Sequence, residues 1–269
     1  MARIALGIEY DGSAFRGWQQ QSHARSVQGV IESALAAVAD HPVQLTAAGR
    51  TDAGVHALMQ VAHFDTAAVR PEQAWVLGGS AEAPDDVSVL WAREVPADFH
   101  ARFGAIARTY LYRILNRRVR PALERQRSAW VRRPLDVGAM HAAAQALLGE
   151  HDFSAFRAAE CQSSTPVRRV TNLEVRRAGD HVEITIRANA FLHHMVRNVA
   201  GSLIAVGVGD RPPQWVGEVL EGRDRTRAGA TAAPQGLYFA GVEYDDEFGL
   251  PCLARPSGRL RAASLGEPP

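Results

Sequence analysis

The amino-acid sequence predicts an α+β protein made of two ferredoxin-like βαββαβ halves, with mixed or antiparallel sheets and a cleft between the halves. The first observation is the order of local patterns, strand-helix-strand-strand-helix-strand, in residues 1–105. The second is the return of that order in residues 106–250, although the halves share no obvious sequence repeat. Residues 251–269 are rich in Pro, Gly, Ser and Arg without periodicity, and we expect a loosely ordered tail there. A cleft between two such halves is a common place for a functional site.

Apolar periodicity defines the elements of the first half. Residues 4–10 alternate between apolar and other side chains, which predicts a strand. Residues 26–38 carry apolar side chains at helical spacing, and Ser26 suits the N-cap. Pro71 suits the first turn of a second helix. The expected strands are 4–10, 43–49, 57–64 and 87–95, and the expected helices are 26–38 and 71–81.

The second half follows the same reasoning. Asp136 and Gly149 are typical start and stop signals for a helix over 137–148. Gly179-Asp180 separates two alternating segments, as a tight turn between strands does. The expected strands are 110–115, 167–177, 181–188 and 237–244, and the expected helices are 137–148, 191–206 and 213–221.

Composition excludes several classes of protein. The 269 residues are 46% hydrophobic and 22% charged, which is ordinary for a globular chain. No apolar run approaches the roughly 18 residues of a membrane span, and the N-terminus lacks the apolar core of a signal peptide. Cys161 and Cys252 are far apart, so we expect neither a disulfide framework nor a thiolate metal site. These features favour a cytoplasmic location without membrane attachment.

The basic residues are unevenly distributed. All 30 are Arg, for which genomic base composition is a sufficient explanation. Residues 101–133 contain ten Arg and one acid, Glu124, a formal charge of +9 in a chain whose net charge is only +1. The planar guanidinium suits bidentate contacts to phosphate. The pattern therefore indicates a localised site for a polyanion.

The most informative segment is residues 49–57, which read GRTDAGVHA between two expected strands. Gly49 and Gly54 permit backbone conformations that a Cβ forbids, and they permit close approach of a ligand. Arg50 and Asp52 are two residues apart and share a face if the chain is extended. Spacing alone favours a structural loop held by an Arg–Asp pair.

This segment resembles the catalytic loop of the tRNA pseudouridine synthase A family. Further blocks are similar to that family in the same order, over about residues 4–245. They are YDG at 10–12, FRGWQ at 15–19, FHARF at 99–103, RTYLY at 108–112, HDFSAF at 151–156, NAFLHHMVRN at 189–198 and G-L-Y at 236–238.

The resemblance implies isomerisation of uridine to pseudouridine at positions 38, 39 and 40 of the tRNA anticodon stem-loop, without cofactor or metal. The glycosidic C–N bond breaks, the uracil turns, and C5 bonds to C1′. Asp52 matches the family's catalytic aspartate and takes the role of nucleophile. A carboxylate is ionised at neutral pH and needs no activating base. The sequence leaves open whether the carboxylate attacks the sugar or the base.

Other roles follow from the resemblance, position by position. Arg197 pairs with Asp52, Tyr110 packs on the target base and assists proton transfer at C5, and Leu237 forms an apolar wall behind the uracil. Arg50 helps to hold the target nucleotide out of the base stack. Pattern alone also fits a solvated helix arginine at 197 and a core aromatic at 110.

The resemblance also implies a tRNA partner and a homodimer in which each tRNA contacts both subunits. Within the arginine-rich segment, Arg102, Arg108, Arg117 and Arg118 are the expected phosphate contacts. The sequence departs from the family at Ser80 and Ala83, where Asn and Leu are usual, which puts the packing of that turn in doubt.

Two alternatives come from other classes of function. A metal hydrolase could use His56, His63, His193 and His194 with Asp52, but the sequence has no HExxH motif, and adjacent histidines on a helix point apart. A catalytically silent module that binds tRNA and assists its folding is the second alternative, against which stand the matched Asp52, Tyr110 and Arg197.

Overall fold

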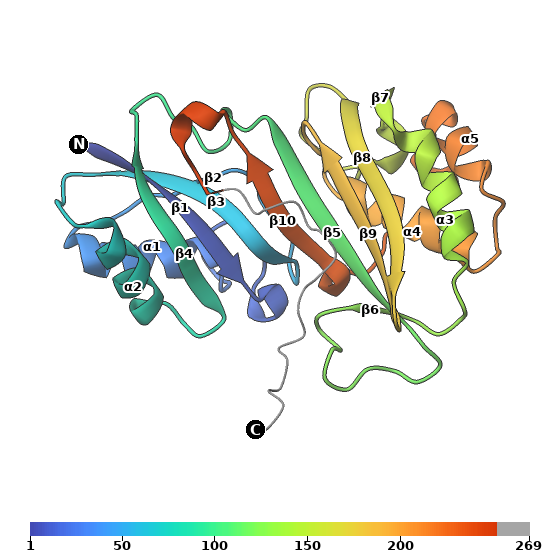
Figure 1. Cartoon of the computed structure of the whole chain (residues 1–269), viewed down its shortest axis with the longest axis horizontal. Helices are drawn as coiled ribbons and strands as arrows, with labels where there is room; N and C mark the ends of the chain where they lie inside the picture. Colours follow the sequence, from blue (N-terminus) through green and yellow to red (C-terminus); the bar gives the residue numbers. More distant parts are fainter. Residues whose placement is uncertain (252–269) are drawn as a thin grey trace, which may run out of the picture.

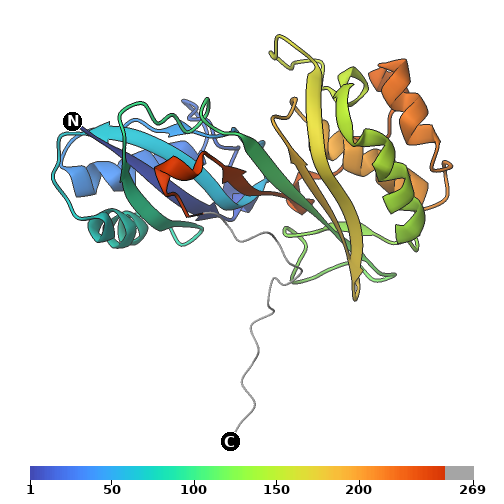
Figure 2. The ribbon, with the colours of Figure 1, turned by 45° about the horizontal axis from the view of Figure 1, so that its top comes forward.

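A single sheet runs through the molecule and carries both halves of the chain (Figure 1). The computed structural model describes residues 1–251. In that part the strand order is β4-β1-β3-β10-β5-β9-β8-β7, with β2 paired to β3 and β6 paired to β5. Helices α1 and α2 lie at one end, helices α3, α4 and α5 at the other, and the central strands β10 and β5 lie between them (Figures 1 and 2).

The elements have the following bounds. The strands are β1 (Ala2–Tyr10), β2 (Thr46–Ala47), β3 (His56–Thr66), β4 (Val87–Val95), β5 (Ala107–Asn116), β6 (Ala129–Val131), β7 (Gly149–Asp152), β8 (Val167–Ala178), β9 (His181–Ala188) and β10 (Leu237–Glu243). The α-helices are α1 (Val27–Ala39), α2 (Glu72–Glu82), α3 (Val137–Ala144), α4 (Met195–Gly207) and α5 (Trp215–Gly222).

The predicted α+β class is confirmed, and each half has the ferredoxin-like strand order. The first half gives β4-β1-β3-β2 and the second gives β10-β5-β9-β8. The halves join because β10 pairs antiparallel with β5 and also parallel with β3, through Tyr238↔His56 and Phe239↔Ala57. The shared strand turns the two expected sheets into one continuous sheet.

Several element boundaries differ from the sequence-based expectation. The strand expected at 43–49 is reduced to Thr46–Ala47, because the chain then leaves the sheet as a loop. The helix expected at 191–206 begins at Met195, after a left-handed residue at His194. Strands β6 and β7 were not expected, because three or four residues are too few to display an alternation. The predicted N-caps are confirmed: Ser26 accepts from Gly29 N, and Asp136 accepts from Ala139 N.

The departures at 80 and 83 are accommodated at the C-terminal end of α2, where Ser80 lies in the last turn and Ala83 is the C-cap. Ser80 Oγ accepts a hydrogen bond from Val89 N at 3.0 Å and donates to Val89 O at 3.3 Å, so its hydroxyl joins α2 to β4. The Ala83 amide donates to Gly79 O and closes the last turn of the helix. The smaller side chains are therefore compatible with a well-bonded turn.

The described residues include no helix that combines the length and hydrophobicity needed to cross a membrane. The tail expected at 251–269 lies outside the described residues except for Pro251.

Candidate active site

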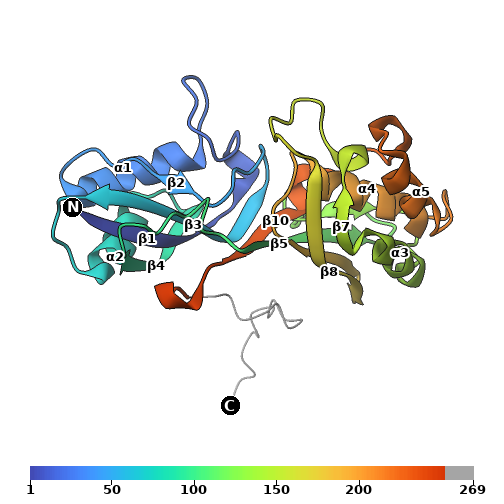
Figure 3. The same ribbon diagram turned by 90° about the horizontal axis from the view of Figure 1, so that it is seen from above.

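A cleft of about 1290 Å³ opens between the two halves and is lined by residues of both. The first half supplies the loop after β2, and the second supplies the segment before α4 and the start of β10. Loops at 19–25 and 158–166 rise on the same side of the sheet and contribute to the cleft walls (Figure 3). The sequence-predicted residues that line the cleft are Arg50, Asp52, Arg102, Arg108, Tyr110, Arg197 and Leu237.

The loop that carries Asp52 is fixed by hydrogen bonds from buried residues of the first half. Gln60 Nε2 donates to Gly49 O at 2.7 Å. The Tyr10 hydroxyl bonds to Thr51 Oγ1 at 2.7 Å, and Trp18 N donates to Thr51 O at 3.0 Å. Buried polar groups that are paired in this way resist displacement, since breaking a bond leaves an unsatisfied group that costs roughly 1–3 kcal/mol. The position of Asp52 is therefore set by the first half's own core.

The two glycines of the loop serve different purposes. Gly54 has φ 77°, in the left-handed region, so its lack of a Cβ has the predicted conformational reason. Gly49 does not have a positive φ, which corrects half of the prediction. A Cβ at Gly49 would lie 3.1 Å from the Phe239 ring, a tight contact, so glycine lets the loop pack closely against β10.

Asp52 receives three cationic or polar partners from one short segment of the second half. Arg197 Nη1 lies 3.1 Å from Asp52 Oδ2. His193 Nε2 lies 3.3 Å from Oδ1, and His194 Nε2 lies 3.1 Å from Oδ2. The Asp52 side chain stays 29% exposed, so the carboxylate is held at the cleft surface and is accessible.

The histidines reach Asp52 because they precede the helix. His194 is the N-cap of α4 with φ 61°, and the two imidazole rings lie with centroids 4.0 Å apart. The expectation that adjacent histidines point apart is therefore wrong here, because it assumed helical geometry at 193 and 194. Burial, opposed by the Asp52 charge, lowers the pKa of His194, which favours a neutral ring at neutral pH.

Arg197 is held by two acceptors. Its Nε donates to Ala232 O at 2.8 Å while Nη1 faces Asp52, and the side chain is only 14% exposed. Ala232 can lie this close because Gly201 faces the same segment: a Cβ at Gly201 would fall 1.8 Å from Ala230 O. The backbone at 230–232 thus packs directly on α4 and orients the guanidinium.

The wall of the cleft beside Asp52 is apolar and aromatic. Tyr110 on β5 makes edge-to-face contacts with Phe191 at 4.8 Å and Phe239 at 5.0 Å between ring centroids. Leu237, at the start of β10, is buried and lines the same cleft. Burial raises the pKa of Tyr110, and the Asp52 charge contributes, so the phenol stays protonated.

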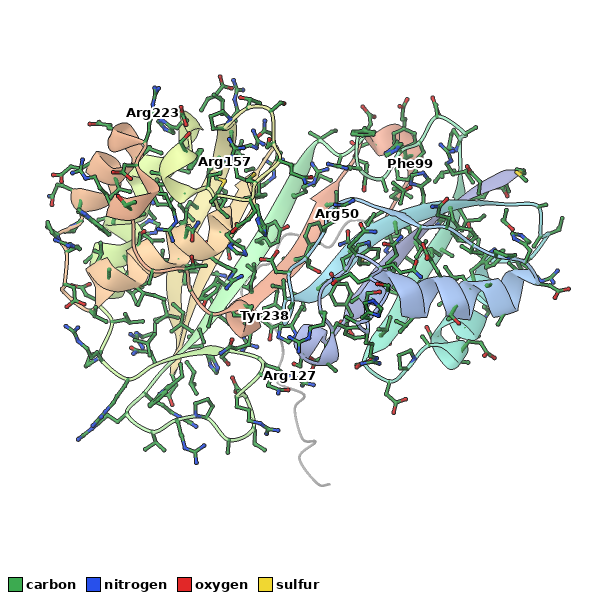
Figure 4. The ribbon with its side chains drawn as sticks, turned by 180° about the vertical axis from the view of Figure 1, so that it is seen from behind. Arg50, Phe99, Arg127, Arg157, Arg223 and Tyr238 are labelled. Atoms are coloured by element: carbon green, nitrogen blue, oxygen red, sulfur yellow. The ribbon has the colours of Figure 1, made fainter. Side chains whose placement is uncertain are left out.

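The arginines expected at the site separate into distinct groups. Arg50 is exposed and lies between the two halves in Figure 4. Arg102 is also exposed on the cleft, whereas Arg108 is partly buried and donates to the carbonyls of Ala48, Asn189 and Arg102. Arg117 and Arg118 are exposed after β5 and do not line the cleft.

A divalent cation has one candidate set of ligands in the described residues. One oxygen of Asp52 and one nitrogen each of His193 and His194 lie within 4.8 Å of one another. Carboxylate and imidazole suit zinc and related metals. The Arg197 guanidinium contacts the same carboxylate and would repel such a cation.

The chain is similar in sequence to known proteins of one family. The family model described as tRNA pseudouridine synthase matches residues 7–104 and 143–245. A protein named tRNA pseudouridine synthase A from Methylococcus capsulatus is 58% identical over 248 residues, which covers 92% of each chain. Proteins of the same name from Nitrosococcus oceani and Coxiella burnetii are 57% and 55% identical, over 94% and 93% of this chain and 98% and 96% of theirs. The chain belongs to the tRNA pseudouridine synthase family.

Proposed function

We propose that this chain isomerises uridine to pseudouridine at positions 38, 39 and 40 of the tRNA anticodon stem-loop, with Asp52 as the nucleophile. Family membership supports the reaction and the tRNA substrate. The observation that carries the assignment of Asp52 is its position in the cleft, accessible and within 3.1 Å of the Arg197 guanidinium. An anion held there faces the oxocarbenium-like centre that forms when the glycosidic bond breaks.

The reaction moves one bond and one proton. The N1–C1′ bond breaks, the uracil turns within the cleft, and C5 bonds to C1′ while the C5 proton leaves and N1 gains a proton. Arg197 donates a hydrogen bond to Asp52 Oδ2 and holds the carboxylate in its orientation throughout. The apolar wall of Tyr110 and Leu237 holds the detached uracil. The C5 proton passes to water, and the Tyr110 hydroxyl assists this transfer through hydrogen bonds, because it remains protonated and can both donate and accept.

The target base must first leave the anticodon stem. Extrusion costs a few kcal/mol, which contacts to the flanking backbone and the base have to offset. Arg50 is exposed at the cleft and has the charge and reach for this task. Arg102 lies on the same cleft, and Arg117 and Arg118 offer phosphate contacts farther along the surface. Arg108 supports this surface by bonding the carbonyls of Ala48 and Arg102.

We propose further that two copies of the chain act together and that the enzyme works in the cytoplasm, where tRNA is processed. The resemblance to the family supports the dimer, and each tRNA then contacts both subunits. Arg117 and Arg118 are exposed outside the cleft, where they are placed to contact tRNA that is bound mainly by the other copy.

Mapping of pseudouridine in an unmodified tRNA transcript tests the function. We expect new pseudouridine at positions 38, 39 or 40 wherever these are uridine, and nowhere else in the transcript. Transcripts with cytidine at each position in turn serve as controls and should lose the corresponding signal. Modification confined to another arm of the tRNA would refute the positional assignment.

Chelation of metal ions is expected to leave the rate unchanged. The proposed chemistry uses a carboxylate that is already ionised and requires no Lewis acid. The measurement is pseudouridine formation after incubation with excess EDTA and buffer exchange. A loss that added Zn²⁺ restores would mean that Asp52, His193 and His194 hold a working metal, contrary to the proposal.

A further inference from the structure

Phe103 is an exposed aromatic side chain in a polar cleft. It is 77% exposed and lines the cleft, whereas Phe99, four residues earlier, is completely buried. Leaving a phenyl ring of this size exposed forgoes the favourable free energy that its burial would contribute. A ring in that position is therefore available to a partner that can cover it.

The turn that presents Phe103 is rigid. The amides of Arg102 and Phe103 both donate to His100 Nδ1 at 3.1 Å, and the Gly104 amide donates to His100 O at 2.8 Å. The His100 ring lies against Phe103 with centroids 4.4 Å apart. Phe103 is thus supported by the His100 imidazole and stays 77% exposed, so a ligand that stacks on it has little local backbone to order.

Arg108 connects this turn to the catalytic loop. Its Nη2 donates to Arg102 O at 2.6 Å and to Ala48 O at 3.0 Å, and Ala48 lies four residues before Asp52. The Arg108 guanidinium therefore bonds both the residue before Phe103 and the start of the loop that carries Asp52. A group stacked on Phe103 is therefore held at a fixed position relative to Asp52.

The charge of the cleft identifies the class of partner. Its lining contains six arginines and two acids; the arginines are Arg16, Arg50, Arg102, Arg108, Arg168 and Arg197. The Arg102 guanidinium lies 5.5 Å from the Phe103 ring centroid. A cationic cleft with a stacking surface suits unpaired nucleic acid, in which phosphates meet arginine and bases meet aromatic rings.

We propose that Phe103 stacks on an unpaired nucleobase of the RNA substrate other than the uridine that is isomerised. This inference rests on the proposed function, in which Tyr110 and Leu237 enclose the reacting uracil and leave Phe103 to a second base. Every nucleobase has a π-face, so the contact holds the RNA in register without reading sequence.

The first test measures binding of unmodified tRNA to full-length variants. Phe103→Ala is expected to raise Kd and KM by about 5- to 150-fold, the range for loss of one base–aromatic stack. Phe103→Tyr keeps a flat ring and should bind as the parent does, whereas Phe103→Leu keeps apolar volume and should be weakened nearly as much as Phe103→Ala. The loss should fall on KM more than on kcat.

Salt dependence separates stacking from charge. No cation is removed in Phe103→Ala, so the slope of log Kd against log salt should equal that of the parent, whereas Arg102→Ala should reduce it by roughly 0.7–0.9. Leu77→Ala is the matched control, since it removes an exposed apolar side chain from α2, away from the cleft. Thermal unfolding of every variant excludes misfolding as the cause.

The second test detects the stack directly. tRNAs with 2-aminopurine at successive positions of the anticodon loop should include one whose fluorescence is quenched by the parent and by Phe103→Tyr but not by Phe103→Leu. Parent-like affinity of Phe103→Leu, no Phe103-dependent quenching, or a change of oligomeric state with unchanged affinity would each overturn the proposal. Absence of pseudouridine with the parent protein would instead refute the proposed function, since binding is measured independently of turnover.

Discussion

Asp52→Asn is expected to reduce pseudouridine formation by on the order of 10⁴-fold or more, the size of loss that follows removal of a nucleophile in other enzymes. The amide has nearly the same shape as the carboxylate but carries no negative charge, so it neither attacks nor stabilises a cationic centre. The measurement is tritium release from tRNA labelled at uracil C5, at saturating enzyme. Binding of tRNA should stay within a few-fold of the parent, because the arginines of the cleft are intact.

A matched control is available outside the cleft. Asp65→Asn also removes a carboxylate that pairs with an arginine, since Asp65 Oδ1 lies 2.8 Å from Arg3 Nε, but it lies far along β3 and does not line the cleft. An exposed ion pair of this kind contributes little to stability, so Asp65→Asn should retain activity. Continued tritium release by Asp52→Asn would eliminate Asp52 as the nucleophile. If the parent releases tritium and Asp52→Asn binds tRNA without releasing it, the catalytically silent alternative is excluded for the parent protein.

Local sequence patterns predicted the elements whose stability is local. The helix over 26–38 differs by one residue at each end from α1, because its apolar spacing and the Ser26 cap act within a few residues. The α+β class followed from the order of such elements. Strand β10 was expected at 237–244, but its pairing with both halves was not, because pairing with β3 joins residues far apart in the sequence and leaves no local signature.

The histidines were the main omission from the site. The apolar spacing around 191–206 predicted a helix through His193 and His194, and a helix would have separated their rings. The left-handed residue at His194 carries no sequence signal comparable to glycine. Arg108 illustrates a related limit. The sequence predicted a phosphate contact for its guanidinium, and the structure shows the same group bonded to three backbone carbonyls. A sequence pattern does not distinguish these two uses of an arginine.

Arg197→Ala is expected to lower kcat by about 10²- to 10³-fold, the typical effect of removing one preorganised charged donor, with a smaller change in KM. The variant leaves Asp52 facing His193 and a His194 that is mainly neutral at pH 7. Arg197→Lys should fall between parent and alanine, because an ammonium cannot span both Ala232 O and Asp52 Oδ2 with a planar fork. Single-turnover kinetics at saturating enzyme measures the effect on the chemical step.

Arg133→Ala is the matched control, since Arg133 also joins a carboxylate, that of Asp210, to a backbone carbonyl, that of Val208, outside the cleft. The pH profile then distinguishes electrostatic from structural loss. Burial and the Arg197 charge both lower the pKa of His194, so removing Arg197 allows that pKa to rise toward its ordinary value. Protonated His194 restores a cation beside Asp52, so the residual rate of Arg197→Ala should increase as pH falls from 7.5 to 6. If the residual rate of Arg197→Ala does not change over this pH range, Arg197 acts through packing instead of charge. The same conclusion follows if the rate still rises at low pH in the double variant Arg197→Ala with His194→Ala.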